Sequence, residues 1–119
     1  PQGTLAERIR AYGAGLGGVL TPTGLGTVIQ EGKQIVNVDG KDYILEKPLK
    51  ADIAFLRANI VDEDGNMVFL GTSQNFNPLM AMAADYVVVE AEKLVKNGEI
   101  APEQIHASGI FVDGIYLEK

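Results

Sequence analysis

The feature that most limits the possible folds is the glycine-rich segment GAGLGGVLTPTGLGT at residues 13–27. Its first six residues fit the G-x-G-x-x-G spacing of a dinucleotide-binding turn, but that motif needs a buried strand before the glycines and a helix after them. Here a helical pattern precedes the glycines, and Pro22 with two further glycines prevents a long helix from following them. The segment therefore predicts a helix end and a loop, and it disfavours a dinucleotide site.

The helical pattern lies in TLAERIRAYG at residues 4–13, where Leu5 and Ile9 share one face. Thr4 and Glu7 have the spacing of a capping box, which predicts that the helix begins at Thr4. Threonines are interleaved with the glycines that follow. So many glycines indicate backbone that packs closely against another chain segment or a ligand.

Further along the chain, a short helix expected near Pro78 is followed by a buried strand expected at 86–90, and this order predicts an α/β fold. Two apolar runs on either side of Asp39-Gly40 predict a hairpin, and two later apolar runs are typical of strands buried on both faces. The expected strands are 35–38, 43–45, 53–58, 67–70, 86–90 and 110–112, with a further apolar run at 115–117, a turn at 62–66 and a short helix near Pro78.

Composition narrows the class of protein. With 119 residues and 46% hydrophobic content, the chain can bury one ordinary core and not two. The net charge of −6 and the scattered Lys and Arg residues argue against a nucleic-acid groove. The sequence has no cysteine for a thiolate nucleophile or zinc ribbon, and its single histidine cannot build a metal site without carboxylates. No apolar run approaches the length of a membrane span, and we expect a cytoplasmic protein.

Three patterns that could carry chemistry have simpler explanations. The acidic turn at 62–64 is too short for a calcium loop and is better explained as a solvated turn. Glu90 and Glu92 share one strand face, but surface carboxylates are commoner than a glycosidase pair. His106 and Ser108 lack a nucleophile elbow and a third partner, so a structural or surface histidine is favoured over a catalytic one.

Two polar segments are stronger candidates. Gln2, in PQGT, stands just before the expected helix, where backbone N–H groups and the helix dipole favour a carboxylate or a developing oxyanion. Asn75 and Asn77, in SQNFN, stand before the second helix. From the residues alone these two are better explained as turn and capping residues than as ligand contacts.

Three segments together, PQGTLAERIRAYGAGLGGVLTPTGLGT, NFNPLMAMAAD and IHASGIFVDGI, strongly resemble the alpha subunit of two-subunit 3-oxoacid CoA-transferases, particularly the bacterial acetate or butyrate:acetoacetate enzymes. The resemblance covers essentially the whole chain. It implies an open, mainly parallel sheet with helices and a β-hairpin excursion. Alpha subunits of this family are roughly twice as long and begin with a VGGFG-like segment that is missing before Pro1. The resemblance thus implies that residues 1–119 are the carboxyl-terminal part of a single domain whose amino-terminal half is absent.

The family's activity is the ping-pong transfer of coenzyme A between carboxylic acids, through a thioester on a glutamate of the beta subunit. The resemblance therefore implies a beta-subunit partner, short-chain acyl-CoA and carboxylate substrates, no metal and no permanently bound cofactor, coenzyme A entering as a substrate thioester. It assigns Gln2 to the active site as a polar residue. The expected substrate and coenzyme A contacts are Gly17, Gly18, Thr21, Thr23, Gly24 and Asn75.

One residue departs from the family pattern, because relatives place Arg or Lys where this chain has Gln74. The loop from Gly17 to Leu20 resembles the short-chain bacterial enzymes, which favours acetate or butyrate over succinate as the acceptor. A non-catalytic assembly or sugar-phosphate-binding module on a related α/β scaffold remains the alternative, because fold alone does not settle function.

Overall fold

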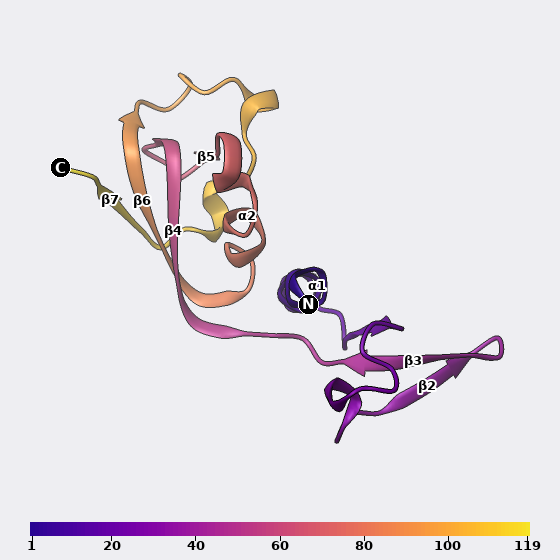
Figure 1. Cartoon of the computed structure of the whole chain (residues 1–119). Helices are drawn as coiled ribbons and strands as arrows, with labels where there is room; N and C mark the ends of the chain where they lie inside the picture. The colour runs from indigo at the N-terminus through magenta and orange to yellow at the C-terminus, as the bar shows by residue number, and fades with distance from the viewer. The chain divides into compact units, whose positions relative to one another are not determined.

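The computed structural model describes all residues 1–119 and divides them into two compact units, residues 1–50 and residues 51–119 (Figure 1). Each unit has its own sheet and is described by itself. None of the helices is both long enough and apolar enough to cross a lipid bilayer.

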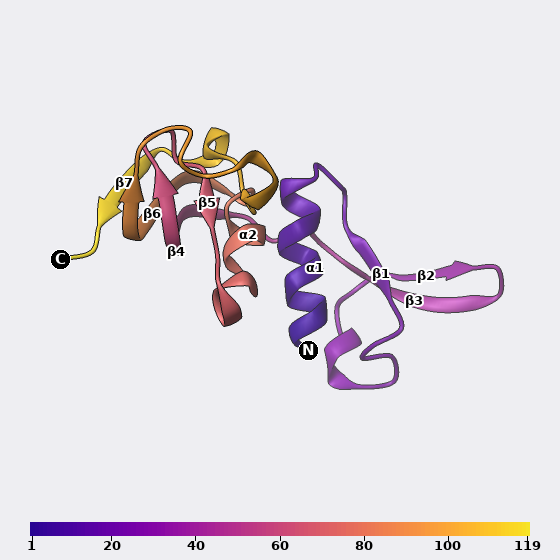
Figure 2. The same ribbon diagram turned by 90° about the horizontal axis from the view of Figure 1, so that it is seen from above.

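The first unit packs one helix beside a small antiparallel sheet (Figure 2). The sheet has the strand order β1-β3-β2, with β3 in the centre. Its elements are α1 (Gln2–Gly13), β1 (Val19–Thr21), the 3-10 helix η1 (Val28–Gln30), β2 (Ile35–Val38) and β3 (Lys41–Glu46).

The predicted hairpin is confirmed. Strands β2 and β3 are joined by Asp39 and Gly40, which both adopt positive φ, +50° and +81°. That pair of angles is typical of the two-residue turn whose twist matches the strands. The side-chain oxygen of Asn37 accepts a hydrogen bond from the Gly40 N–H at 3.0 Å and holds the turn.

The end of α1 is as predicted, but its start is not. The helix ends at Gly13, and the glycine loop follows. It begins at Gln2 after Pro1, and no side chain caps it, so the expected capping box at Thr4 and Glu7 is wrong. Glu7 accepts hydrogen bonds from the guanidinium of Arg10 instead. Because the helix begins at Gln2, Thr4 lies inside its first turn and Glu7 in its second, where the glutamate lies beside Arg10 and not beside the helix start.

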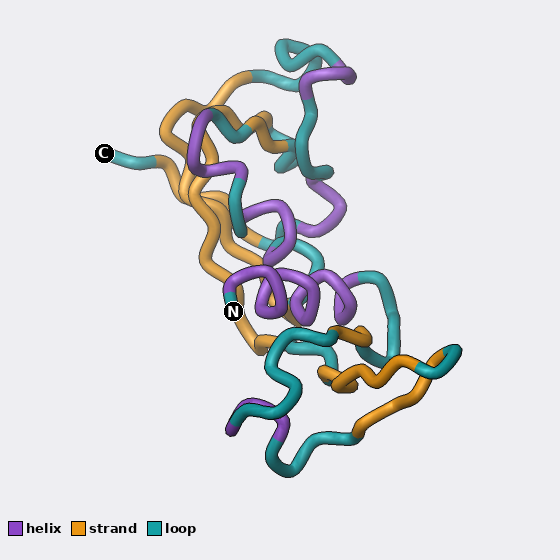
Figure 3. Tube along the Cα trace, turned by 45° about the vertical axis from the view of Figure 1, so that its right-hand side comes forward, coloured by secondary structure: helices purple, strands orange, loops and turns teal.

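The second unit contains a four-stranded mixed sheet, β5-β4-β6-β7. β6 runs parallel to both β4 and β7, and only β5 is antiparallel, which confirms the α/β class with a mainly parallel sheet. Figure 3 colours the strands of the chain orange and its helices purple. The elements are β4 (Ala51–Asp62), β5 (Met67–Val68), η2 (Gly71–Gln74), α2 (Asn77–Met80), β6 (Ala84–Val95), η3 (Pro102–Gln104), η4 (Gly109–Phe111) and β7 (Gly114–Leu117).

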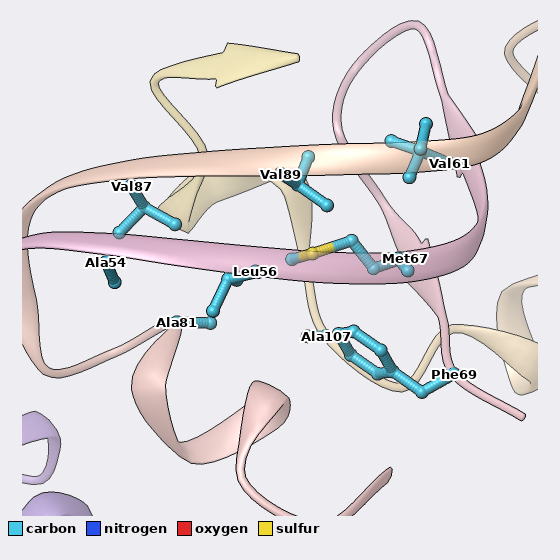
Figure 4. Close-up of a cluster of buried hydrophobic side chains, with 11 residues drawn as sticks. Ala54, Leu56, Val61, Met67, Phe69, Ala81, Val87, Val89 and Ala107 are labelled. Atoms are coloured by element: carbon cyan, nitrogen blue, oxygen red, sulfur yellow. The ribbon is translucent and has the colours of Figure 1, made fainter. Parts of the chain in front are cut away.

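The core of this unit lies on one face of the sheet (Figure 4). Leu56 and Val89 point into it from neighbouring strands, and Phe69, directly after β5, and Ala81, directly after α2, close it. The expectation that both faces are buried is wrong within these residues, because Phe55, on the other face of β4, is 73% exposed. Both connections between the parallel strands pass over the same face and leave the second one bare.

The expected strand at 110–112 is also wrong. Gly109–Phe111 forms a 3-10 helix, and the last strand is β7. Two contacts explain the difference. The Ser108 hydroxyl accepts a hydrogen bond from the Ile110 N–H, and Gly109 packs so closely on the Asp64 backbone that a Cβ there would lie 1.9 Å from the Asp64 carbonyl oxygen. This contact fixes the segment to the turn at 62–66 before β7 can begin.

Candidate functional site

Gln2 occupies the first position of α1 and is exposed. The first turn of this helix carries no acidic side chain and no side-chain cap. Backbone N–H groups at such a helix start attract anions, because the helix dipole adds partial positive charge there. The start of α1 is therefore suited to a carboxylate or an oxyanion, as the sequence predicts for Gln2.

An open depression of about 510 Å³ lies against this part of the first unit. Its lining comes from the first two turns of α1, through Thr4 and Glu7, and from β1 and the following loop, through Thr21 and Thr23. The structure thus brings two of the predicted binding residues beside the helix start. Gln2 does not itself line the depression, although its neighbours Pro1 and Gly3 do.

The threonine loop is held by its own hydrogen bonds. The Thr21 hydroxyl oxygen accepts a hydrogen bond from the Thr23 N–H at 3.2 Å. The Thr27 hydroxyl donates to the Gly24 carbonyl at 2.7 Å. A loop tied in this way presents its side chains in fixed positions, which a binding wall requires.

The glycines predicted to contact substrate or coenzyme A differ in whether the fold of the chain itself requires glycine at that position. A Cβ on Gly18 would lie 2.7 Å from the Glu46 carbonyl oxygen, and one on Gly24 would lie 2.8 Å from Ile29. Both residues also adopt positive φ, +151° and +99°. The fold of this chain therefore requires glycine at these two sites. Gly17 has nothing within 4 Å of a built Cβ and no positive φ, so its own chain does not require glycine there.

The buried carboxylate of Glu46, which the sequence did not reveal as a site residue, connects α1 to β3. Glu46 is only 4% exposed, and its carboxylate accepts a hydrogen bond from Lys33 Nζ at 2.7 Å, with Arg8 Nε at 4.0 Å. Arg8 Nε also donates to the Lys47 carbonyl at 2.8 Å. These contacts tie α1 to β3, and the Glu46 carbonyl lies against Gly18. The alternation of faces along a strand could have revealed the burial of Glu46, since Glu46 shares a face with Ile44, which is fully buried.

The second unit holds Asn75, which is exposed and follows η2, where its N–H donates to the Thr72 carbonyl at 3.2 Å. The neighbouring amides serve the turn. Gln74 Nε2 donates to the Phe69 carbonyl at 2.9 Å, and Asn77 Nδ2 donates to the Ser73 carbonyl at 2.9 Å. Asn77 Oδ1 also accepts from the Arg57 N–H of β4, so Asn77 has a structural role, but it is the first residue of α2 and does not cap that helix, so the expected capping is wrong.

His106 has a structural role, one of the two that the sequence predicts for it, and Ser108 has a structural role as well. His106 Nδ1 accepts a hydrogen bond from the Phe69 N–H at 3.0 Å, and the two rings stack with centroids 6.4 Å apart. The Ser108 oxygen caps η4. A histidine whose Nδ1 binds a backbone amide and a serine that caps a helix do not form a nucleophile and base pair.

The acidic residues are tied into the fold as well. The predicted turn is present, but Asp62 is buried and not solvated as expected. Its carboxylate accepts hydrogen bonds from the backbone of Asp64 and from both nitrogens of Asn66. Glu90 and Glu92 do share a face of β6, and Glu92 accepts from Asn59 Nδ2 at 2.9 Å.

Comparison with known proteins identifies related chains. Residues 1–118 match the family model described as Coenzyme A transferase. The chain is 51% identical to the alpha subunit of acetate CoA-transferase from Escherichia coli, over 100% of this chain and 54% of that protein. It is 53% identical to the alpha subunit of acetoacetyl-CoA:acetate/butyrate CoA transferase from Clostridium acetobutylicum, over 99% of this chain and 54% of that protein.

A relative named for a different acid matches almost as well. A subunit of succinyl-CoA:3-ketoacid coenzyme A transferase from Helicobacter pylori is 50% identical, over 98% of this chain and 50% of that protein. Among solved structures, an acyl-CoA transferase from Escherichia coli, in a thioester complex with CoA, superimposes with a TM-score of 0.86 at 26% identity, over 99% of this chain and 27% of that one. The chain spans about half the length of the curated relatives that it matches.

Proposed function

Because this chain belongs to the coenzyme A transferase family, we propose that it forms one wall of the active site of an enzyme that moves coenzyme A between acetoacetate and a short-chain acid. Acetate or butyrate is the proposed acid. The transfer is ping-pong and passes through a thioester on a glutamate of the partner beta subunit. Coenzyme A enters as a substrate thioester, and no cofactor is permanently bound.

The observation that carries this proposal is the start of α1 at Gln2, which has no side-chain cap and no acidic residue in its first turn. When a carboxylate attacks a thioester, the carbonyl oxygen becomes an oxyanion before the thiolate leaves. Backbone N–H groups and a neutral amide can donate hydrogen bonds to that oxygen. The first turn of α1 supplies such donors without a competing acidic side chain.

A neutral residue suits this position better than a cation would. Arginine or lysine at Gln2 would pair with the partner's glutamate and weaken it as a nucleophile. An amide donates a hydrogen bond and leaves the carboxylate charged but unpaired. The hydroxyls of Thr21 and Thr23, beside the same helix start, are available to the acyl chain or to the pantetheine of coenzyme A.

The choice of acid rests on the loop and on the relatives. Gly17 and Gly18 leave little side-chain bulk ahead of β1, and two relatives carry acetate in their names. A relative named for succinyl-CoA matches at similar identity. Acetate or butyrate is therefore our proposal rather than a consequence of family membership.

We further propose that residues 1–119 are the carboxyl-terminal half of a cytoplasmic alpha subunit that acts only with its beta subunit. Two of the relatives are alpha subunits, and each is about twice as long as this chain. This chain alone is then expected to be inactive, because the nucleophilic glutamate lies on the partner.

The test is an assay of coenzyme A exchange with the complete alpha and beta subunits. Acetoacetyl-CoA is offered with acetate, butyrate or succinate, and each new thioester is measured. We expect the highest kcat/KM for acetate or butyrate. A preference for succinate would overturn the choice of acid. Failure of exchange with every acid would leave the non-catalytic assembly or sugar-phosphate-binding module.

A further inference from the structure

Leu20 of β1 lines the open depression beside the start of α1. It is 43% exposed and is the one large apolar side chain of that lining that lies so open to solvent, since Val19 is half-buried. A single exposed leucine is ordinary on a protein surface. Inside a depression that also holds hydrogen-bonding groups it has a different meaning, because sites for small molecules combine apolar lining with a few placed polar groups. Leu20 is therefore suited to contact the apolar part of a ligand.

The backbone around Leu20 is held in place. In the sheet β1-β3-β2, Leu20 lies opposite Leu45 of the central strand β3. The next residue, Thr21, accepts a hydrogen bond from the Thr23 N–H with its hydroxyl oxygen at 3.2 Å. A residue on a paired strand next to a tied loop keeps a fixed position relative to its neighbours, which a residue that distinguishes substrates by size requires.

The proposed function fixes how an acid would lie in this depression. The reacting carboxyl group faces the backbone N–H groups at the start of α1, beside Pro1 and Gly3, and the rest of the acid lies along the remaining lining. Glu7 is a poor neighbour for an alkyl chain, because its carboxylate is bound to the Arg10 guanidinium and stays charged. Leu20 supplies the apolar surface that an alkyl chain can bury.

We propose that Leu20 is a specificity-determining residue, which contacts the alkyl chain of the acid beyond its second carbon and favours butyrate over acetate. This inference rests on the proposed function, because it needs the reacting carboxyl group at the start of α1. Acetate ends at its second carbon, whereas butyrate carries two more carbons onto Leu20. One methylene in an enclosed apolar pocket changes kcat/KM by about tenfold or more. Because the depression is open, we expect about tenfold for both carbons together.

The experiment measures kcat/KM for acetate and butyrate with the complete alpha and beta subunits and acetoacetyl-CoA as the donor. Leu20→Ala is expected to lower the ratio of butyrate to acetate about tenfold, and Leu20→Met, which keeps the apolar surface, is expected to retain most of the original ratio. Ile35→Ala is the matched control. Ile35 is 41% exposed on β2 of the same sheet, loses the same number of carbon atoms and does not line the depression, so its ratio is expected to stay unchanged.

Three results would overturn the inference: an unchanged ratio in Leu20→Ala, an equal loss for both acids, or loss of the complex with the beta subunit in gel filtration. An equal loss would place Leu20 against pantetheine, and loss of the complex would make it an interface residue. If Leu20→Ala does not fold, Leu20→Val is used, and its ratio is expected to fall by a smaller factor. Absence of exchange in the unaltered enzyme would refute the proposed function itself, whereas normal exchange with an unchanged ratio would refute only the role of Leu20.

Discussion

Replacement of Gly18 by alanine tests whether the glycine loop is shaped by its own chain. The new Cβ would lie 2.7 Å from the Glu46 carbonyl oxygen and 2.9 Å from Leu45 Cδ1. The leucine side chain can rotate away, but the carbonyl belongs to β3, where Glu46 pairs with Val19. The residue would also keep a φ of +151°, which disfavours any side chain.

The close contact with the Glu46 carbonyl and the positive φ together determine how much the free energy of unfolding should fall. Overpacking against a fixed group costs about 1–3 kcal/mol, and a strained backbone costs about 1–3 kcal/mol. We expect Gly18→Ala to lower the free energy of unfolding by about 3 kcal/mol. For a subunit of about 200 residues this corresponds to a fall in Tm of about 6–12 °C.

Gly17→Ala is the matched control, because nothing lies within 4 Å of its built Cβ. At such a site alanine reduces the freedom of the unfolded chain and is expected to stabilise by about 0.4–1 kcal/mol. Tm and turnover are measured on the same preparations of complete subunits. An unchanged Tm in Gly18→Ala would refute the reasoning. If Gly17→Ala lowers turnover with Tm intact, coenzyme A or the partner approaches that position; unchanged turnover removes Gly17 from the site.

Three further outcomes are expected. Gln2→Ala should lower turnover about a hundredfold, roughly 3 kcal/mol of transition-state stabilisation, with Tm unchanged. Gln2→Glu should lower turnover further than Gln2→Ala. A fall in Tm with normal turnover would make Gln2 a turn residue only. Glu46→Ala should destabilise by about 2 kcal/mol in chemical unfolding, less than a fully buried pair would, because Lys33 remains partly exposed; a loss near zero would contradict its role in holding α1. Arg10 lowers the pKa of Glu7, so the ionised Glu7 carboxylate stabilises the fold at pH values above its unfolded pKa, and this contribution is lost as pH falls through the lower folded pKa. Glu7→Gln should therefore weaken the dependence of folding stability on pH in the acid range. An unaltered pH profile of stability would contradict this prediction.

Local patterns predicted much of the fold. The hairpin at Asp39-Gly40 and the end of α1 depend on residues next to each other, and both are confirmed. The predicted helix start was wrong because the helix begins at Gln2, which places Thr4 inside the first turn and Glu7 in the second, too far along to cap the start. The strand expected at 110–112 failed because Gly109 packs on Asp64, far away in the sequence.

The candidate site shows the same division between local and distant contacts. The family resemblance selected Thr21 and Thr23, and the structure places them beside the start of α1. Glu46 was not selected, although its position on the face of Ile44 could have indicated its burial; its pairing with Arg8 and Lys33 follows from no sequence spacing, because they lie in other segments. Pairing between distant segments is decided by tertiary packing, which one sequence does not display.

The central claim is that this chain forms a wall of a coenzyme A transferase site without supplying the nucleophile. The most direct measurement is to incubate the complete alpha and beta subunits with acetoacetyl-CoA, reduce any enzyme thioester with borohydride and locate the modified carboxyl group by mass spectrometry. We predict one modified glutamate, on the beta subunit, and none within residues 1–119. A modified carboxylate within residues 1–119, or no modification in an enzyme that transfers coenzyme A, would contradict the account.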